Sequence, residues 1–143
     1  MRLEKQITIE RSVDDVFAFL TDMHNVPRWA PVKSVRQVAP GPFRMDVGEQ
    51  YIQVIEFMNQ QVEVMTEITH YAPPSLFGFK TISGPLPLES TFTLTPAGEG
   101  TRVDLVSEGD PDSVVKKLGP LVVNVAKKQV DSQLAALKQL LEA

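Results

Sequence analysis

Residues 120–141 read PLVVNVAKKQVDSQLAALKQLL, and this stretch decides the fold. Projected at about 100° per residue, it separates into two faces. At a rise of about 1.5 Å per residue the predicted helix is roughly 33 Å long, about the width of a small domain. Because one helix cannot bury an apolar arc alone, the rest of the chain must supply a matching surface. The predicted arc holds Leu121, Val122, Val125, Ala126, Val130, Leu134, Leu137 and Leu141.

Two glutamines, Gln129 and Gln133, interrupt the middle of this arc. A buried amide without a partner costs roughly 1–3 kcal/mol, so each side chain needs water, a protein partner or a ligand. Gln129 is expected either at the edge of the arc or facing a cavity, and Gln133 at the edge.

Composition bounds the class of protein. The 143 residues, 43% hydrophobic and 22% charged, fit one globular domain. The net charge of −4 argues against a nucleic-acid partner, which would require a basic surface. The chain has no cysteine, no signal-peptide pattern at its N-terminus and no apolar run near the roughly 20 residues of a membrane span. These features predict a cytoplasmic protein without integral membrane contact.

The first 31 residues predict a strand followed by short helices. Residues 2–10 alternate sufficiently for a strand. Ser12 opens the sequence Ser-Val-Asp-Asp, which has the layout of a capping box, and the helix that follows should end near Asp22. Residues 25–31 (NVPRWAP) hold two prolines and the only tryptophan, Trp29, so they form at most one irregular turn.

The middle of the chain predicts an antiparallel meander, because successive strand patterns are joined by short turns. Strands are expected at 32–38, 48–58, 62–71, 76–82, 86–95 and 101–107, with turns at 59–61 and 96–100. Residues 109–118 should make a further helical turn or two before a kink at Gly119-Pro120. The predicted inner face of the sheet carries Ile68, Phe77, Phe79, Leu88, Phe92, Leu94, Val103 and Leu105.

This order of elements predicts an α+β fold, in which a curved antiparallel sheet of about seven strands wraps around a long C-terminal helix, with two short helices after the first strand. The inner face of the sheet offers more apolar surface than one helical arc covers. A curved sheet that does not close on its helix leaves a mostly apolar cavity, the usual setting for a small ligand.

Several local patterns, taken in order, resemble the SRPBCC superfamily, which has the helix-grip or START/Bet v 1-like fold, and within it the polyketide cyclase/dehydrase and lipid-transport group. None of these patterns is a catalytic signature, and members of that superfamily bind lipids, quinones, hormones or polyketides, while some are enzymes. The patterns are IERSVDDVFAFLTDMHNVPRWAP (9–31), VGEQY (47–51), ITHYAPPSLFGF (68–79), FTLTPAGEGTRV (92–103) and LKQLLE (137–142).

The resemblance implies a deep cavity between the sheet and residues 120–141. Its mouth is expected near the Trp29 turn, the Gly84-Pro85 loop and residues 110–119. Each expected ligand contact could equally be ordinary core, since burying one large apolar side chain contributes roughly 1.5–3 kcal/mol. The expected ligand contacts are Trp29, Phe57, Phe77, Phe79, Phe92, Leu118, Val122, Val125 and Gln129.

Three side chains are weak candidates for acid–base chemistry. His70 shares strand parity with Ile68, so it could point inward, while Glu56 and Glu67 lie on the two arms of the 48–71 hairpin. Exposure to solvent is the simpler expectation for all three. Two histidines without cysteine make a poor metal site, and the sequence predicts neither metal nor cofactor.

Three classes of function therefore remain open. The first is binding or transport of a small hydrophobic molecule, lipid, quinone or polyketide-like, and the lack of a complete catalytic set favours it. The second is a polyketide-cyclase-like enzyme in the same cavity, with His70, Glu67 or Glu56 as acid–base groups and Gln129 or Tyr71 holding a carbonyl. The third is a protein-interaction module. A weak homodimer through exposed strands is compatible with each.

Overall fold

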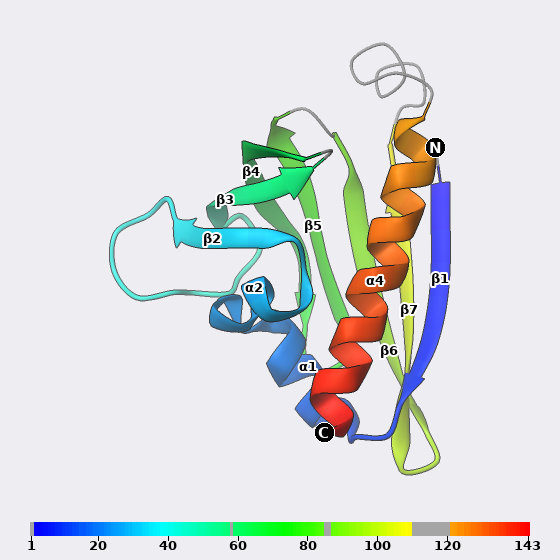
Figure 1. The fold of residues 1–143 in the computed structure, drawn as a ribbon. Coiled ribbons are helices and arrows are strands. Elements are labelled where there is room, and N and C mark those ends of the chain that lie inside the picture. The colour runs from blue at the N-terminus through cyan, green and yellow to red at the C-terminus, as the bar shows by residue number, and fades with distance from the viewer. Residues whose placement is uncertain (1, 58, 85–86, 110–120) are drawn as a thin grey trace.

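The structure, a computed structural model, describes residues 2–57, 59–84, 87–109 and 121–143 (Figure 1). Its described strands form one antiparallel sheet in the order β1-β7-β6-β5-β4-β3-β2. The predicted meander is therefore confirmed from β2 to β7, and β1 adds to it by pairing with β7. The strands are β1 (Arg2–Ile9), β2 (Val32–Gln37), β3 (Gln50–Phe57), β4 (Gln60–Ala72), β5 (Leu76–Ser83), β6 (Glu89–Ala97) and β7 (Gly100–Glu108).

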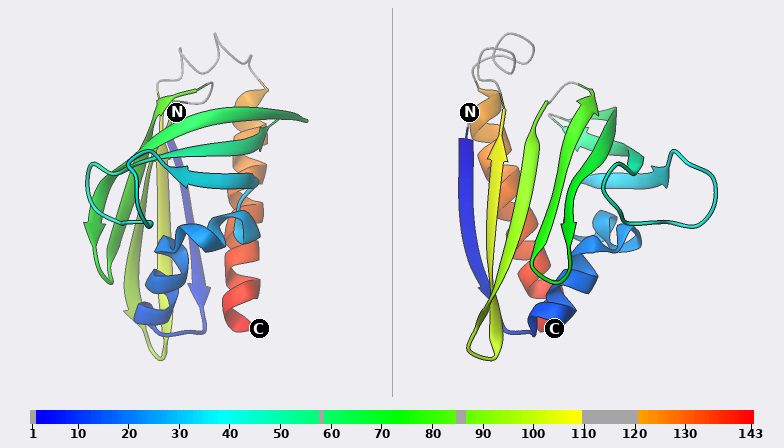
Figure 2. Two further views of the ribbon diagram at one scale, coloured as in Figure 1. Left: turned by 90° about the vertical axis from the view of Figure 1, so that its left-hand side faces the viewer. Right: turned by 180° about the vertical axis from the view of Figure 1, so that it is seen from behind.

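The helices lie on one face of the sheet (Figures 1 and 2). The sheet curves around α4 (Val122–Glu142), which is the predicted long helix. The shorter elements α1 (Val13–Thr21), η1 (Met23–Asn25) and α2 (Val26–Trp29) gather near the C-terminal end of α4. The predicted start of α1 is confirmed, because the Ser12 hydroxyl accepts a hydrogen bond from the Asp15 backbone at 3.2 Å.

Two hairpins are tighter than the sequence predicts. β4 begins at Gln60 rather than residue 62, and Asn59 adopts a φ of 64° in the turn before it. The β6–β7 turn consists of Gly98 and Glu99 alone, since Ala97 already pairs with Gly100. Gly98 has a φ of 61°, a conformation that glycine adopts without steric cost and that lets two residues reverse the chain.

The prediction of the apolar arc of α4 is correct for the C-terminal part of the helix and wrong at its start. Leu134, Leu137 and Leu141 are buried, whereas Leu121 is 69% exposed. Leu121 is the N-cap residue of α4, so its side chain is not held to the helical spacing. The expected turn at 109–118 and the kink at 119–120 lie outside the described residues, apart from Gly109. No helix in the described ranges has the length and hydropathy needed to cross a membrane.

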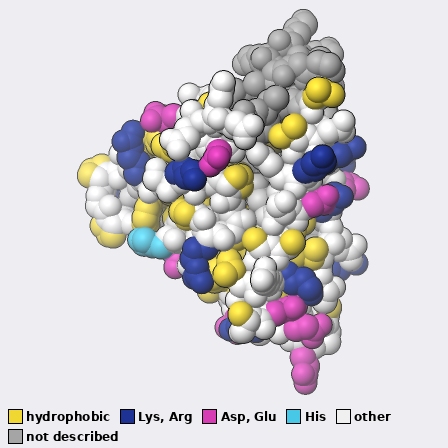
Figure 3. Space-filling view, viewed as in Figure 1, with side chains coloured by type: hydrophobic (Ala, Val, Ile, Leu, Met, Phe, Trp, Pro, Cys, Tyr) yellow, Lys and Arg dark blue, Asp and Glu magenta, His cyan; other side chains and the backbone are white. Residues whose placement is uncertain are grey.

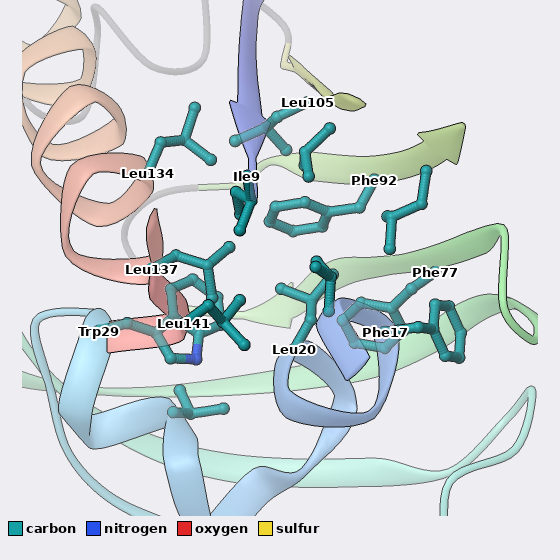
Figure 4. Close-up of a cluster of buried hydrophobic side chains, with 14 of the residues drawn as sticks. Ile9, Phe17, Leu20, Trp29, Phe77, Phe92, Leu105, Leu134, Leu137 and Leu141 are labelled. Atoms are coloured by element: carbon teal, nitrogen blue, oxygen red, sulfur yellow. The ribbon is translucent and has the colours of Figure 1, made fainter. Parts of the chain in front are cut away.

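The core lies where α1, α2 and the C-terminal half of α4 meet the sheet (Figure 4). Figure 4 shows aliphatic side chains from β1 and α4 around Phe92 of β6. The Trp29 ring packs edge-to-face on Phe92, with 6.3 Å between ring centroids. This packing fixes α2 against the sheet and so fixes one wall of the space between sheet and helix.

Gly100, the first residue of β7, allows β1 to approach β7 closely. A Cβ atom at this position would lie 2.6 Å from the backbone oxygen of Ile9. We expect Gly100→Ala to lower the free energy of unfolding by about 1–3 kcal/mol, because two backbones must separate. Urea denaturation measures the loss, and Glu99→Ala in the same exposed turn is the control. Equal stability of the two variants would contradict this close approach.

Candidate ligand-binding cavity

A cavity of about 170 Å³ lies between the inner face of the sheet and α4. Every strand contributes to its wall, although β2 does so only through its first residue, Val32. The helical elements α1, η1, α2 and α4 contribute as well. Its size matches the roughly 150 Å³ apolar cavity that holds a benzene molecule in an engineered protein. The wall is mostly apolar and includes Leu20, Met23, Val26, Val64, Ile68, Leu88, Leu105, Ala126 and Val130.

One part of the wall is aromatic. Phe77 and Phe92 are buried and stacked, with ring centroids 6.2 Å apart and planes inclined by 22°. Phe79 packs on Phe77 at 5.7 Å. The sequence predicted that Phe77, Phe79 and Phe92 share the inner face of the sheet, and the structure places all three on the cavity wall.

Trp29 belongs both to the core and to the cavity wall. Its side chain is 7% exposed and lines the cavity. The buried Nε1–H makes no hydrogen bond within the described part of the chain. A buried donor without a partner costs about 1–3 kcal/mol, so a hydrogen-bond acceptor at this N–H would stabilise the folded protein.

Four hydroxyl side chains lie on the cavity wall along strands β4 to β7, and we call them the hydroxyl row: Thr66, Thr81, Ser90 and Ser107. Thr66 is opposite Thr81 in the β4–β5 register, and Ser90 is opposite Ser107 in the β6–β7 register. The two serine Oγ atoms are 2.8 Å apart. Residues opposite each other in register share a face of the sheet, so the row gives an otherwise apolar cavity a polar side.

The hydroxyl row was not predicted from the sequence, although a signal was present. Ser90 has the strand parity of Phe92, and Ser107 has that of Leu105, so both belonged to the predicted inner face. Small polar residues at such positions are easily counted as breaks in an apolar pattern rather than as part of a site.

The two glutamines of α4 lie at the boundary of the cavity. Gln129 and Gln133 both line it, and both also line a more open groove between α2 and α4. The Gln129 side-chain amide donates to the backbone carbonyl of Glu56 at 3.4 Å, so the predicted need for a partner is met partly by the protein. Val125, expected on the cavity wall, lines the groove instead.

Three expected ligand contacts cannot be placed. Leu118 lies outside the described residues, and the side chains of Phe57 and Val122 are not described either. Part of the expected mouth, residues 85 and 110–119, is outside the described ranges as well.

The three acid–base candidates lie away from the cavity. A bulge in β4 between Ile68 and His70 shifts the register against β5, so His70 is exposed although Ile68 is buried. The His70 ring then lies against Gly78, where a Cβ atom would be 2.8 Å from its Nδ1.

The two glutamates lie on the outer side of the same hairpin and bind cations there. The Glu56 carboxylate pairs with Lys33 at 3.0 Å, and Glu67 accepts from the Gln50 amide at 3.1 Å and lies 3.6 Å from the Lys80 ammonium. Within the described ranges, no group of three His, Cys, Asp or Glu could hold a metal ion.

Tyr51 of β3 is a buried part of the cavity wall. Its hydroxyl donates to the backbone carbonyl of Arg44. Burial, and secondarily the Glu49 carboxylate, raise the pKa of the Tyr51 phenol, while Arg44 acts in the opposite direction. The folded chain therefore keeps this proton at alkaline pH values where the unfolded chain has lost it.

The stability that Tyr51 contributes should therefore be complete below a pH of about 10 and should be lost as pH rises through the folded-state pKa. We expect Tyr51→Phe to be less stable than the wild type by about 1 kcal/mol at pH 7, because the Arg44 carbonyl loses its donor. The difference should narrow at higher pH. Urea denaturation of both proteins from pH 7 to pH 11 measures it, and a constant difference would be inconsistent with this linkage.

Comparison with known proteins places this geometry among related folds. The sequence model of the family described as "Polyketide cyclase / dehydrase and lipid transport" matches residues 1–142. No curated protein gives a significant match.

Solved structures with the same fold cover nearly the whole chain. A protein of Thermus thermophilus is 22% identical, with a TM-score of 0.76 over 97% of this chain and 95% of its own. A START superfamily protein from Mycobacterium smegmatis is 21% identical, with a TM-score of 0.76 and coverage of 99% and 97%. The Zhui aromatase/cyclase from a Streptomyces species is 15% identical, with a TM-score of 0.78 and coverage of 99% and 93%.

Proposed function

Because the chain belongs to the polyketide cyclase/dehydrase and lipid-transport family of the SRPBCC superfamily, we propose that it binds a small, oxygen-bearing hydrophobic molecule between the sheet and α4. The observation that carries this proposal is the combination of an aromatic wall and the hydroxyl row in one cavity. Apolar surface supplies the driving force for such binding, and a few fixed polar groups supply orientation.

The size of the cavity sets the size of the ligand. A volume of about 170 Å³ suits a body of one or two rings, or a short branched chain. A double-chain lipid would require the sheet and α4 to separate. The stacked pair Phe77 and Phe92 offers the flat apolar surface that an aromatic or quinone ring would contact.

The hydroxyl row favours an oxygen-bearing ligand over a hydrocarbon. A hydrocarbon that displaces water from Thr66 and Thr81 leaves their hydroxyl groups without that partner, whereas a carbonyl or hydroxyl group replaces the lost hydrogen bond. Trp29 belongs to the same wall, and its buried Nε1–H has no hydrogen-bond partner in the described part of the chain. The polar groups of the described wall are hydroxyls, amides and an indole, which suit recognition of oxygen atoms.

Binding, rather than acid–base chemistry, is what these groups support. His70, Glu56 and Glu67 lie outside the described cavity wall, so the cyclase-like route through them has no group beside the proposed ligand. We expect the alanine variants of all three to bind the probes below with wild-type affinity.

The test compares two probes of one shape, 1,4-naphthoquinone and naphthalene, by ligand-detected NMR titration. The quinone should bind more tightly, and Thr66→Val should weaken its binding by roughly 2- to 12-fold, the value of one hydrogen bond, without affecting naphthalene. Thr93→Val, on the exposed side of β6, is the matched control. Failure of both probes to bind the wild type, with no shift of its melting temperature, would refute the proposal.

A further inference from the structure

A groove on the surface between α2 and α4 adjoins the cavity. Its α4 side is formed by residues three or four positions apart, which therefore share one face of the helix: Val125, Lys128, Gln129, Ser132, Gln133 and Ala136. Its other side is formed by residues 28–31. The groove and the cavity adjoin, because five residues line both of them: Trp29, Ala30, Pro31, Gln129 and Gln133.

The charges along this groove are all of one sign. Arg28 and Lys128 are the ionised residues among the described residues that line it, and both are cations, although the whole chain carries a net charge of −4. Two carboxylates, one on β3 and one on α4, are already paired with other cations. Glu56 binds Lys33 at 3.0 Å, and Asp131 of α4 binds Lys5 of β1 at 3.0 Å.

We propose that this groove binds the carboxylate of an amphiphilic ligand whose apolar body occupies the cavity. The inference rests on the proposed function for the apolar end, and it adds the chemistry of the other end. A ligand that extends past Trp29 leaves the apolar wall and reaches two cations that have no carboxylate partner in the described part of the chain. An anionic head group is the complement of that surface.

Arg28 is held in place for this role. Its Nη1 donates to the Asn25 side-chain oxygen at 3.2 Å, and its guanidinium carbon lies 5.4 Å from the centre of the Phe19 ring. These contacts orient the guanidinium without neutralising it, and they leave N–H groups for a carboxylate. Ser132 and Gln133 add a hydroxyl and an amide along the same groove.

The surface agrees with this arrangement. Figure 3 shows Lys and Arg side chains over both α2 and α4, with hydrophobic side chains on the face between them. Cations along a groove that adjoins an apolar cavity suit a ligand with one charged end, and they would raise the association rate of an anion over that of a neutral analogue.

The test uses naphthalene-2-acetate and its neutral isostere naphthalene-2-acetamide, titrated at pH 7.5 by calorimetry. We expect the carboxylate to bind the wild type roughly 2- to 30-fold more tightly than the amide, the range for two exposed ion pairs, and to lose most of that preference in 0.5 M salt. The double variant Arg28→Gln/Lys128→Gln should bind both probes equally. Its affinity for the amide should match that of the wild type.

The control is Arg36→Gln/Lys127→Gln, which removes the same charge from exposed positions outside the groove. This control should still bind the carboxylate more tightly than the amide. Arg28→Lys should do so too, because it keeps a cation at this position even if the substitution perturbs α2. Equal binding of the two probes to the wild type would overturn this inference alone. Binding of neither probe would count against the proposed function. If the control variant lost the preference for the carboxylate equally, the preference would come from the net charge of the chain and not from the groove.

Discussion

Replacing Ala126 with phenylalanine is expected to abolish ligand binding, by more than about 100-fold or roughly 2.8 kcal/mol. Ala126 projects from α4 into the cavity wall and is 3% exposed. A benzene ring fits a cavity of about 150 Å³, so a phenyl group attached at this position takes most of the 170 Å³ available. The ligand and the new ring cannot occupy the same space.

The stability of this variant should change little. Filling the cavity adds apolar contacts worth about 0.8 kcal/mol for each buried methylene equivalent, and overpacking costs about 1–3 kcal/mol in the opposite direction. Ala135→Phe, on the exposed face of the same helix, is the matched control and should bind as the wild type does. Calorimetric titration with naphthoquinone measures the affinity of both variants and of the wild type. Wild-type affinity in Ala126→Phe would mean that the ligand binds elsewhere.

Replacing Leu137 with alanine is expected to lower the free energy of unfolding by about 3–5 kcal/mol. Leu137 is 0% exposed and lies in the cluster where α4 meets β1 and α1 (Figure 4). The substitution removes buried methyl groups from a site fixed by neighbours on three elements, so the surroundings cannot collapse into the space. A loss of this size is a large share of the roughly 5–15 kcal/mol by which most domains are stable.

Leu140→Ala tests whether the effect belongs to that position. Leu140 is only partly buried against the same cluster, so its loss should be nearer to about 1 kcal/mol. Urea denaturation at pH 7 compares the two variants. Equal losses would contradict the packing described for α4.

The fold was predictable because its signals are local. The period of residues 120–141, the Ser12 cap and the alternation on β6 and β7 each follow from residues within a few positions of one another. The position of β1 beside β7 depends on the whole chain, and no local pattern predicted it. The predicted lengths of the two turns were wrong for a related reason. Asn59 and Gly98 have positive φ angles and reverse the chain in fewer residues than the flanking polar residues suggested.

The wall of the cavity was predictable in its apolar part only. Phe77, Phe79 and Phe92 followed from strand parity, and the structure places them on the cavity wall. The simpler expectation for His70, exposure to solvent, is confirmed. Its strand parity with Ile68 pointed inward, but a bulge after Ile68 inverts that parity, and a sequence pattern gives no sign of a bulge. The hydroxyl row was hidden in the same way, since it depends on the register between strands.

The outer groove depends on tertiary contacts altogether. Arg28 and Lys128 are 100 positions apart, and only the packing of α2 against α4 brings them to one groove. A net charge of −4 for the chain gave no hint of a local cationic surface.

The most direct test of the central claim is to locate a bound probe by intermolecular NOEs from 1,4-naphthoquinone to methyl groups of the labelled protein. Binding between sheet and helix predicts simultaneous contacts to Thr66 and Ile68 of β4, Leu105 of β7 and Ala126 of α4. Contacts confined to exposed methyl groups such as those of Val38 and Val47 would show that the cavity is not the binding site.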